Sequence, residues 1–253
     1  MSIEEIGTDG PAPAHCCTLG SLAEPAGFDA LAARLRPLVD SDRQAGITLV
    51  HYAVAAVAES VLVWVLAQGA VLDVGPDDVG LCLETDGSAS TWIHRVRPRH
   101  SKDAAFEAGR VAWGLVAAIA ETAAERAPAG RRAVTMITLD ALIAAARRVG
   151  REVRAEPDAT WIGQFLAGAG HPGHEVGREL LVRPDDGAPV AFYVPRVCCV
   201  LNTGPSPHAC PTCPMLPSDE VRTERILAML GDLDHDDFRN TAGRPRVGAP
   251  RAG

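Results

Sequence analysis

The sequence predicts an α+β protein with a mainly helical body, two β-hairpins and a C-terminal lobe built around a group of cysteines. Apolar residues recur at helical spacing over several stretches, and two segments alternate apolar and polar residues on either side of an Asp-Gly turn. Four of the seven cysteines fall close together near the carboxyl end. We therefore expect a flexible leader over residues 1–27, a mainly helical domain over 28–189, a cysteine segment over 190–231 and a disordered tail over 232–253.

The composition is that of a globular protein and argues against a nucleic-acid partner. Hydrophobic residues make up 47% of the chain and charged residues 22%, which is enough apolar material for a core. Aromatic residues are only 4%, so the core must consist mainly of Ala, Val and Leu. The net charge of −8 disfavours binding to nucleic acid. The acidic N-terminal segment has no apolar run, so we expect no secretory signal and a cytoplasmic protein.

Gly, Pro and small polar residues interrupt any periodicity over residues 1–27, which indicates a flexible leader. Cys16 and Cys17 form an adjacent pair within it. We interpret them as incidental, with extra metal ligation or regulation as the alternative. From Phe28 the spacing of leucines predicts a helix that Pro37 ends or bends.

The most apolar stretch, residues 47–72, is long enough for a membrane span. Polar residues interrupt it at His51, Glu59, Ser60 and Gln68, and no basic residues flank it. We therefore predict a buried helix, no transmembrane span, and at most peripheral contact with the inner membrane face. His51 is expected to be a core histidine with its hydrogen bonds satisfied.

Residues 79–85 and 91–96 predict a β-hairpin, because both alternate in polarity and an Asp-Gly turn separates them. Cys82 is interpreted as a small strand residue. Ser101 then offers an N-cap for a helix that extends to about Arg126. The buried stripe of this helix is expected to include Phe106, Val111, Leu115 and Ile119.

Thr138 is predicted to cap the next helix, which Gly150 would end. Arginines near this helix form the one basic patch of an acidic chain: Arg131, Arg132, Arg147, Arg148, Arg151 and Arg154. We interpret the patch as a solvated face. The alternative is a docking site for an acidic electron carrier such as a ferredoxin.

Residues 168–173, GAGHPG, match the letters of a dinucleotide-binding motif. The preceding segment is helical in pattern and no crossover helix follows, so we reject a nucleotide site. His171 and His174 have His-x2-His spacing, but no third ligand lies nearby in sequence, so we interpret both as loop residues.

A second predicted hairpin, residues 179–184 and 190–199, leads directly into Cys198 and Cys199. The loop that follows is rich in Gly and Pro, which suits an irregular path around a cofactor. A last helix is predicted from an N-cap at Ser218 to about Leu230.

The four clustered cysteines, Cys198, Cys199, Cys210 and Cys213, indicate a metal centre rather than a disulfide framework. Adjacent residues on an extended chain point to opposite faces, so the adjacent pair serves a single tetrahedral ion poorly. A kinked backbone could bring both sulfurs to a larger centre. A [2Fe–2S] cluster, which takes four thiolates over two irons, is therefore favoured over a structural zinc site. His208 lies nearby, but four cysteines already complete the ligand set.

This pattern, Cys-Cys-x10-Cys-x2-Cys with Arg196 before the pair and Pro214 after the last cysteine, resembles the ferric-siderophore reductases (FhuF-like). The match is specific over residues 196–216 and vague upstream. The resemblance implies that the four cysteines bind a [2Fe–2S] cluster. It also implies that this cluster passes one electron to an iron(III)-siderophore complex, releasing iron(II) in the cytoplasm.

No flavin or nicotinamide motif is present, so the electron is expected from an external donor such as a ferredoxin or a flavin reductase. No catalytic residue is expected beyond the cluster ligands. Trp92, Trp161 and Tyr193 are further candidates for contacts with the substrate. Candidates for tuning the cluster potential are Arg196 and the N–H groups around Ala209, Thr212 and Cys213. The alternative function is a non-enzymatic zinc- or iron–sulfur-binding protein used for structure or redox sensing.

Overall fold

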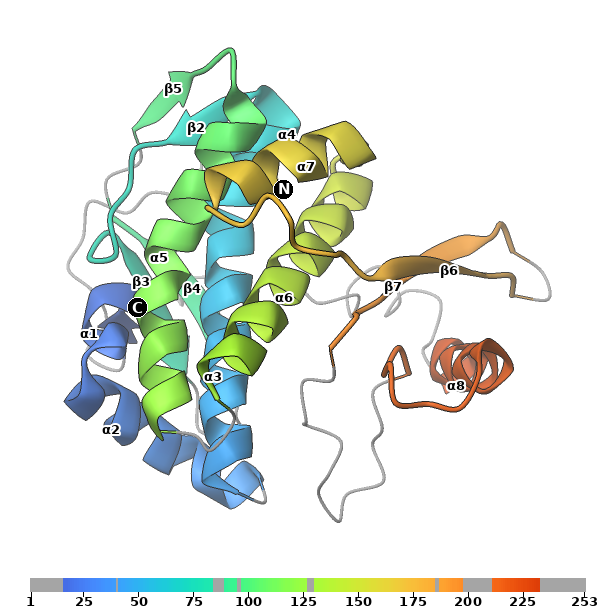
Figure 1. Ribbon diagram of the computed structural model, residues 1–253, viewed down its shortest axis with the longest axis horizontal. Helices are drawn as coiled ribbons and strands as arrows, with labels where there is room; N and C mark the ends of the chain where they lie inside the picture. Colours follow the sequence, from blue (N-terminus) through green and yellow to red (C-terminus); the bar gives the residue numbers. More distant parts are fainter. Residues whose placement is uncertain are drawn as a thin grey trace, which may run out of the picture.

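A computed structural model confirms the α+β class: helices form most of the fold, and the described residues also form three small antiparallel sheets (Figure 1). It describes residues 16–39, 41–83, 89–94, 97–126, 130–184, 187–197 and 211–232. The elements follow in the order β1 (Cys16–Thr18), α1 (Leu19–Ala23), α2 (Pro25–Leu35), the 3-10 turn η2 (Arg36–Leu38), α3 (Asp42–Val57), the π-helical turn η3 (Ala58–Leu62), α4 (Val63–Gln68), β2 (Ala70–Leu72), β3 (Val79–Leu83), β4 (Ala89–Ile93), β5 (Pro98–His100), α5 (Ala104–Arg126), α6 (Arg131–Glu152), α7 (Ala159–Gly168), β6 (Arg178–Val182), β7 (Val190–Val194) and α8 (Asp219–Asp232).

The long apolar helix is buried, as predicted, and forms the centre of the helical body with α5 and α6 (Figure 1). It begins at Asp42, where the Ser41 side chain accepts the N–H of Gln44, and it ends at Gly69, which adopts a left-handed conformation with φ 63°. By length and composition, 42–68 is the one described helix that could cross a membrane, but 71% of its apolar window is buried in the fold. Such burial is typical of a core helix. The predicted helix is wrong at its end, because the chain after Gly69 forms strand β2.

The N-terminal part of the fold corrects the expected leader. Residues 16–27, assigned to a flexible segment, form β1, α1 and the start of α2, with Leu19 and Leu22 fully buried. Cys16 is not incidental, because it forms a disulfide with Cys82 across the β1–β3 ladder. Cys82 is therefore more than a small strand residue. Residues 1–15 lie outside the described part of the chain.

The first predicted hairpin is confirmed: β3 pairs antiparallel with β4, and β1 adds a third strand on the other side of β3. α5 begins at Ala104, so the predicted N-cap at Ser101 is wrong: the carbonyl oxygen of Asp103 accepts the first helical hydrogen bond, and the Ser101 hydroxyl accepts the N–H of Asp103 at 3.2 Å in the turn before the helix. The buried stripe of α5 differs from the predicted one, because Phe106, which was expected to be buried, is 43% exposed.

Small residues occupy that stripe because α7 crosses α5 at very short range. A Cβ atom on Gly109 would lie 1.9 Å from the carbonyl oxygen of Phe165, and one on Gly168 would lie 1.8 Å from that of Phe106. Real Cβ atoms do not approach that closely, so only glycine fits at either position. The helix crossing depends on these two residues.

α6 begins at Arg131, earlier than expected, so Thr138 is not an N-cap but a fully buried mid-helix residue. Its hydroxyl donates to the carbonyl oxygen of Val134 at 2.8 Å, which satisfies it inside the helix. The helix also continues past Gly150 to Glu152. Gly150 is explained by close packing, because a Cβ there would lie 2.6 Å from Cδ of Pro157.

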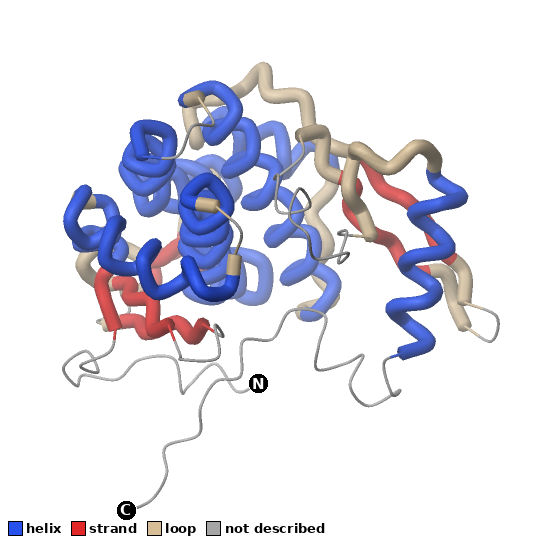
Figure 2. Tube along the Cα trace, turned by 90° about the horizontal axis from the view of Figure 1, so that it is seen from below, coloured by secondary structure: helices blue, strands red, loops and turns tan. Residues whose placement is uncertain are grey.

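The C-terminal part contains the second predicted hairpin, which is confirmed as β6 paired with β7. α8 lies along this hairpin, and the two form a small lobe beside the helical body (Figures 1 and 2). The expected boundary between residues 189 and 190 falls inside the hairpin, so β6 belongs to the same lobe as the cysteine segment. α8 begins after Ser218, as predicted, and residues 233–253 lie outside the described part.

Candidate metal centre

One of the four candidate ligands, Cys213, lies in the described part of the chain; Cys198, Cys199 and Cys210 lie outside it. Cys213 is 3% exposed, and its carbonyl oxygen accepts the N–H of Leu216 at 3.2 Å in the turn before α8. Within the described ranges, no three His, Cys, Asp or Glu side chains come together as a metal site. The structure does describe the chain segments that lead into and out of the cysteine loop.

The segment that leads into Cys198 is held by the carboxylate of Asp140 on α6. Oδ2 of Asp140 accepts the N–H of Arg196 at 2.8 Å and that of Val197 at 3.1 Å. Its Oδ1 accepts the hydroxyl of Tyr193 at 3.0 Å. Asp140 is only 2% exposed, so these charge-assisted hydrogen bonds replace its lost hydration. The last two residues before the cysteine pair are thus fixed relative to α6.

Two further groups surround this carboxylate. The His174 side chain is 5% exposed, and its Nε2 lies 3.4 Å from Oδ1 of Asp140. The hydroxyl oxygen of Tyr193 accepts the N–H of Gly177 at 2.7 Å. Burial raises the pKa of the Tyr193 phenol, and the charge of Asp140 raises it further, so the hydroxyl stays a proton donor. The loop after the GAGHPG sequence therefore supports Asp140 through His174.

The segment that leads out of the loop is held by Arg222 on α8. Its guanidinium donates to three carbonyl oxygens in the Cys213 turn: Cys213 at 3.1 Å, Pro214 at 2.9 Å and Leu216 at 2.8 Å. The Arg222 side chain is 7% exposed. A planar fork of donors suits several converging carbonyls better than a single ammonium group would. The turn that carries Cys213 is thereby fixed to the first turn of α8.

Arg178 connects the segment that leads into the cysteine loop with the segment that leads out of it. It lies opposite Val194, the last residue of β7, in the hairpin register, and its guanidinium forms an ion pair with Asp219 at the start of α8. Asp219 also accepts a hydrogen bond from Arg222 at 2.9 Å. Hydrogen bonding to Arg178 lowers the pKa of Asp219, with Arg222 adding to the effect, so the carboxylate stays charged. A continuous series of contacts therefore joins the end of β7 to the Cys213 turn.

α6 holds the hairpin through a second charged residue, Arg147, which lies two turns beyond Asp140 on the same side of the helix. Arg147 forms an ion pair with Glu179, which faces Tyr193 in the hairpin register. Its guanidinium carbon also lies 6.0 Å from the centroid of the Tyr193 ring. Arg147 is therefore engaged inside the protein.

The prediction of a single basic patch around α6 is wrong, because the arginines do not lie together. Arg131 and Arg132 begin the helix, whereas Arg147, Arg148 and Arg151 lie in its last two turns and Arg154 lies beyond it, roughly 22 Å away or more at about 1.5 Å per residue. Three members form ion pairs with glutamates: Arg131 with Glu125, Arg147 with Glu179 and Arg151 with Glu156. The sequence groups residues that the helix separates.

The other sequence candidates have partners of their own. Trp92 stacks on His94 with ring centroids 5.4 Å apart, and Trp161 stacks on Phe165 at 5.3 Å. The Arg196 guanidinium forms an ion pair with Glu175. The rings of His171 and Trp113 form a T-shaped contact, with their centroids 4.7 Å apart. Ala209 and His208 lie outside the described residues.

Sequence reasoning missed Asp140 and Arg222. The signal for Asp140 was a carboxylate inside the otherwise uncharged run ITLDALI, in which Ile137, Leu139, Leu142 and Ile143 are buried. Arg222 gave no comparable signal, because DEVRTERI reads as an ordinary solvated helix face until the turn folds back onto it.

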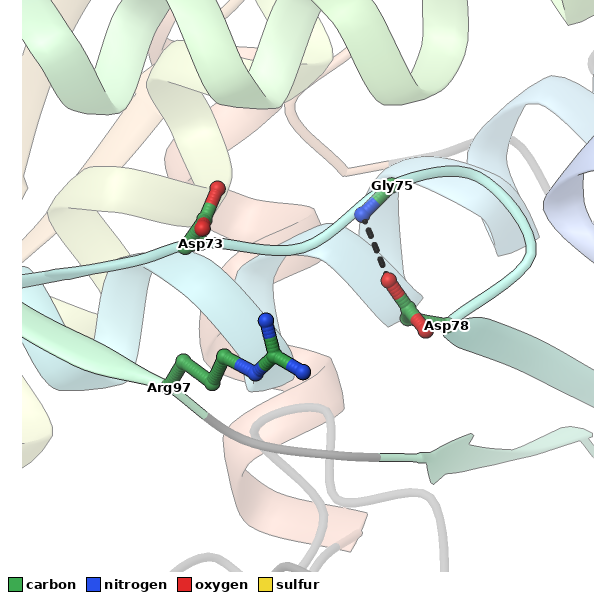
Figure 3. A pocket seen from close by; sticks show the side chains of 4 residues that line it. All are labelled: Asp73, Gly75, Asp78 and Arg97. Carbon is green, nitrogen blue, oxygen red and sulfur yellow. Dashed lines mark hydrogen bonds between the residues drawn. The ribbon is translucent and has the colours of Figure 1, made fainter.

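A separate polar pocket of about 210 Å³ lies between the β2–β3 loop and the residue before β5, lined by Asp73, Gly75, Asp78 and Arg97 (Figure 3). The N–H of Gly75 donates to Oδ2 of Asp78 at 2.9 Å. Two carboxylates and one guanidinium give the pocket mixed charge, and it shares no residue with the Asp140 or Arg222 contacts.

Comparison with protein-family models and with curated proteins finds no match for this chain.

Proposed function

We propose that this protein is a one-electron reductase of iron(III)-siderophore complexes, with a [2Fe–2S] cluster held by Cys198, Cys199, Cys210 and Cys213. The observation that carries the proposal is the Cys-Cys-x10-Cys-x2-Cys spacing, which places four thiolates in one short segment. The structure adds support, since both ends of that segment are held by buried charged residues.

The described residues fit a centre of this kind. Cys213 is buried, so a metal bound there would be shielded from water on that side. The buried guanidinium of Arg222 fixes three carbonyl oxygens of the Cys213 turn, which would hold this ligand in place. When bound, the cluster would supply a reversible one-electron carrier.

The substrate class follows from ligand chemistry. Siderophores bind iron through hard oxygen donors, which hold iron(III) much more tightly than iron(II). Addition of one electron therefore releases iron without cleaving the chelator. The electron must come from a reduced external donor, a ferredoxin or a flavin reductase, which is oxidised by one electron in the same cycle.

The proposal places the chain in the cytoplasm, where the released iron(II) is used, with at most peripheral contact with the membrane. Disulfides are uncommon in that reducing compartment. The Cys16–Cys82 bond would be reduced there, leaving β1 attached to β3 by its ladder hydrogen bonds.

The test is an anaerobic titration of the reduced protein with several iron(III)-hydroxamate and iron(III)-catecholate complexes. We expect a red-brown protein with two irons per chain whose cluster is reoxidised as iron(II) appears. Replacement of any of the four cysteines with serine should lower iron content and visible absorbance. A colourless protein that contains zinc would favour the structural alternative. A cluster that no siderophore complex reoxidises would favour the redox-sensing one.

A further inference from the structure

The C-terminal lobe of β6, β7 and α8 has buried apolar residues of its own. Val182 of β6, Val194 of β7 and Ile226 of α8 are buried, and none of them belongs to either of the two apolar clusters of the helical body. α8 packs along β6, whereas no helix or strand of the body packs extensively on the lobe within the described ranges (Figure 2). The lobe is therefore a packing unit separate from the body.

A single covalent connection joins the two units in the described chain. The chain passes from α7 through residues 169–177 into β6, and no element of the body follows. The first part of this connection is fixed to the body, because the ring of His171 contacts Trp113 and Nε2 of His174 lies 3.4 Å from Oδ1 of Asp140.

The end of the connection is fixed to the lobe instead. The N–H of Gly177 donates to the hydroxyl of Tyr193 at 2.7 Å, and a Cβ on Gly177 would lie 2.2 Å from the carbonyl oxygen of Val194. Glu175 and Val176 lie between the two fixed parts, in a segment without regular secondary structure. A change in the backbone dihedrals of these two residues would turn the lobe relative to the body, as at a hinge.

Tyr193, near the end of β7, holds the lobe against the body. It is 8% exposed and belongs to an apolar cluster whose other buried members come from the body: Leu139, Ile143, Ile162, Leu166 and Ala169. Among the described residues of the lobe, it is the only one buried in a cluster of the body. Its hydroxyl donates to Oδ1 of Asp140 at 3.0 Å, so the ring has an apolar socket and the hydroxyl a polar one.

The remaining contacts between lobe and body involve charged groups. Arg147 forms an ion pair with Glu179, but its Nε is buried and has no hydrogen-bond partner in the described part of the chain. The carboxylate of Asp140, also buried, accepts the N–H groups of Arg196 and Val197. Burial of charged and unpaired groups offsets part of the gain from the apolar contact. Two units that lack a large apolar interface are expected to move relative to one another.

We propose that the C-terminal lobe is a hinged arm that turns about Glu175 and Val176, and that Tyr193 is the latch that holds it docked on α6 and α7. In the released position the lobe keeps its own core, while Asp140 and the socket of Tyr193 become exposed to water. The inference does not depend on the proposed function, because it concerns only the attachment of described elements to one another.

Tyr193→Phe tests the latch and leaves an aromatic ring in the socket. It removes the hydroxyl that contacts Asp140 and Gly177, whereas the N–H groups of Arg196 and Val197 keep their acceptor. A purely local effect would reach only the Gly177 amide. Release of the whole lobe would also expose the amides of residues 196 and 197.

The first measurement is hydrogen exchange at backbone amides of the full chain. In wild type, the amides of Arg196 and Val197 should exchange faster than those of buried α3, because release of the arm exposes them without global unfolding. Tyr193→Phe should accelerate both about tenfold, the effect of losing a hydrogen bond to a charged group. Amides of the β6–β7 ladder should keep their rates, because the lobe stays folded.

The control is Thr138→Val, which is fully buried on α6 and removes a hydrogen bond that stays within that helix. It should leave the amides of Arg196 and Val197 unchanged. Acceleration confined to Gly177 in Tyr193→Phe would overturn the latch. Equal acceleration of the β6–β7 ladder would overturn the hinged arm, because the lobe would then be unfolding rather than turning.

The second measurement is small-angle X-ray scattering of Tyr193→Ala, which removes the ring from its socket. We expect a larger radius of gyration than in wild type, with unchanged helical content by circular dichroism, and no difference from wild type in Thr138→Val. A folded Tyr193→Ala variant with the wild-type radius of gyration would overturn the proposal. Should Tyr193→Ala lose its helical content, the exchange rates in Tyr193→Phe decide the question.

Discussion

Arg222 and Cys213 are joined by a hydrogen bond of 3.1 Å from the guanidinium Nε to the cysteine carbonyl oxygen, and both residues are buried. The bond fixes the backbone rather than the sulfur of Cys213. A side chain from α8 thus determines where a candidate metal ligand sits, although nothing in the local sequence marks it for that role.

We expect Arg222→Lys to lower the metal content of the protein. A lysine ammonium group cannot serve three carbonyl oxygens and Asp219 together, and each buried acceptor left unpaired costs about 1–3 kcal/mol. Metal per chain after purification, together with protease sensitivity of the segment before α8, checks this. Arg225→Lys is the matched control, because Arg225 is exposed on the same helix. Equal metal content in the two variants would contradict the assigned role.

Gly109→Ala should destabilise the fold by about 3 kcal/mol, because the new methyl group would meet the Phe165 carbonyl oxygen at 1.9 Å. Gly114 lies on the same helix, and a Cβ there meets nothing within 4 Å. Gly114→Ala should therefore stabilise the protein by roughly 0.5–1 kcal/mol, the helix-propensity gain. Urea unfolding of both variants measures the difference. Similar effects in the two would show that α5 and α7 do not cross as described.

Reduction of the Cys16–Cys82 disulfide should lower the free energy of unfolding. The bond spans 66 residues of sequence, and closing a loop of that length in the unfolded chain corresponds to about 4 kcal/mol in the chain-entropy model. Urea unfolding with and without dithiothreitol checks this, and Cys16→Ser should reproduce the reduced value without reductant. Cys17→Ser should leave the difference intact, since Cys17 forms no disulfide.

His51 should make the fold less stable in mild acid. Its Nε2 is buried and has no hydrogen-bond partner among the described residues, contrary to the satisfied core histidine that the sequence suggested. Burial lowers the pKa of His51 from 6.5 to about 4. Between those values the unfolded chain binds the proton and the folded chain does not. Stability is therefore complete above about pH 6.5 and falls as the pH drops toward 4, by up to about 3 kcal/mol.

Unfolding free energies at pH 7 and pH 5 in wild type and His51→Gln measure this contribution. The variant should lose much less stability between the two values than wild type does. His100→Gln, at an exposed strand residue, should behave as wild type. An equal loss in wild type and His51→Gln would assign the acid sensitivity to other groups.

The sequence by itself determined the elements whose signals are local. The two hairpins, the helical part of the apolar stretch 47–72 and the helix after Ser218 all follow from periodicity, turn residues and caps, which act over a few residues. The α+β class follows from those elements. The four-cysteine spacing is equally local, and the metal centre it predicts remains a prediction.

Only the tertiary structure decided which residues hold the two ends of the cysteine segment. Asp140, Arg178 and Arg222 lie far apart in sequence, and each reaches the cysteine segment through partners on another element. The Cys16–Cys82 pairing and the split of the α6 arginines likewise depend on strand register and on helix length in space. The physical reason is that burial of a charge or a thiol is set by what packs over it, and a sequence pattern describes only one side of that contact.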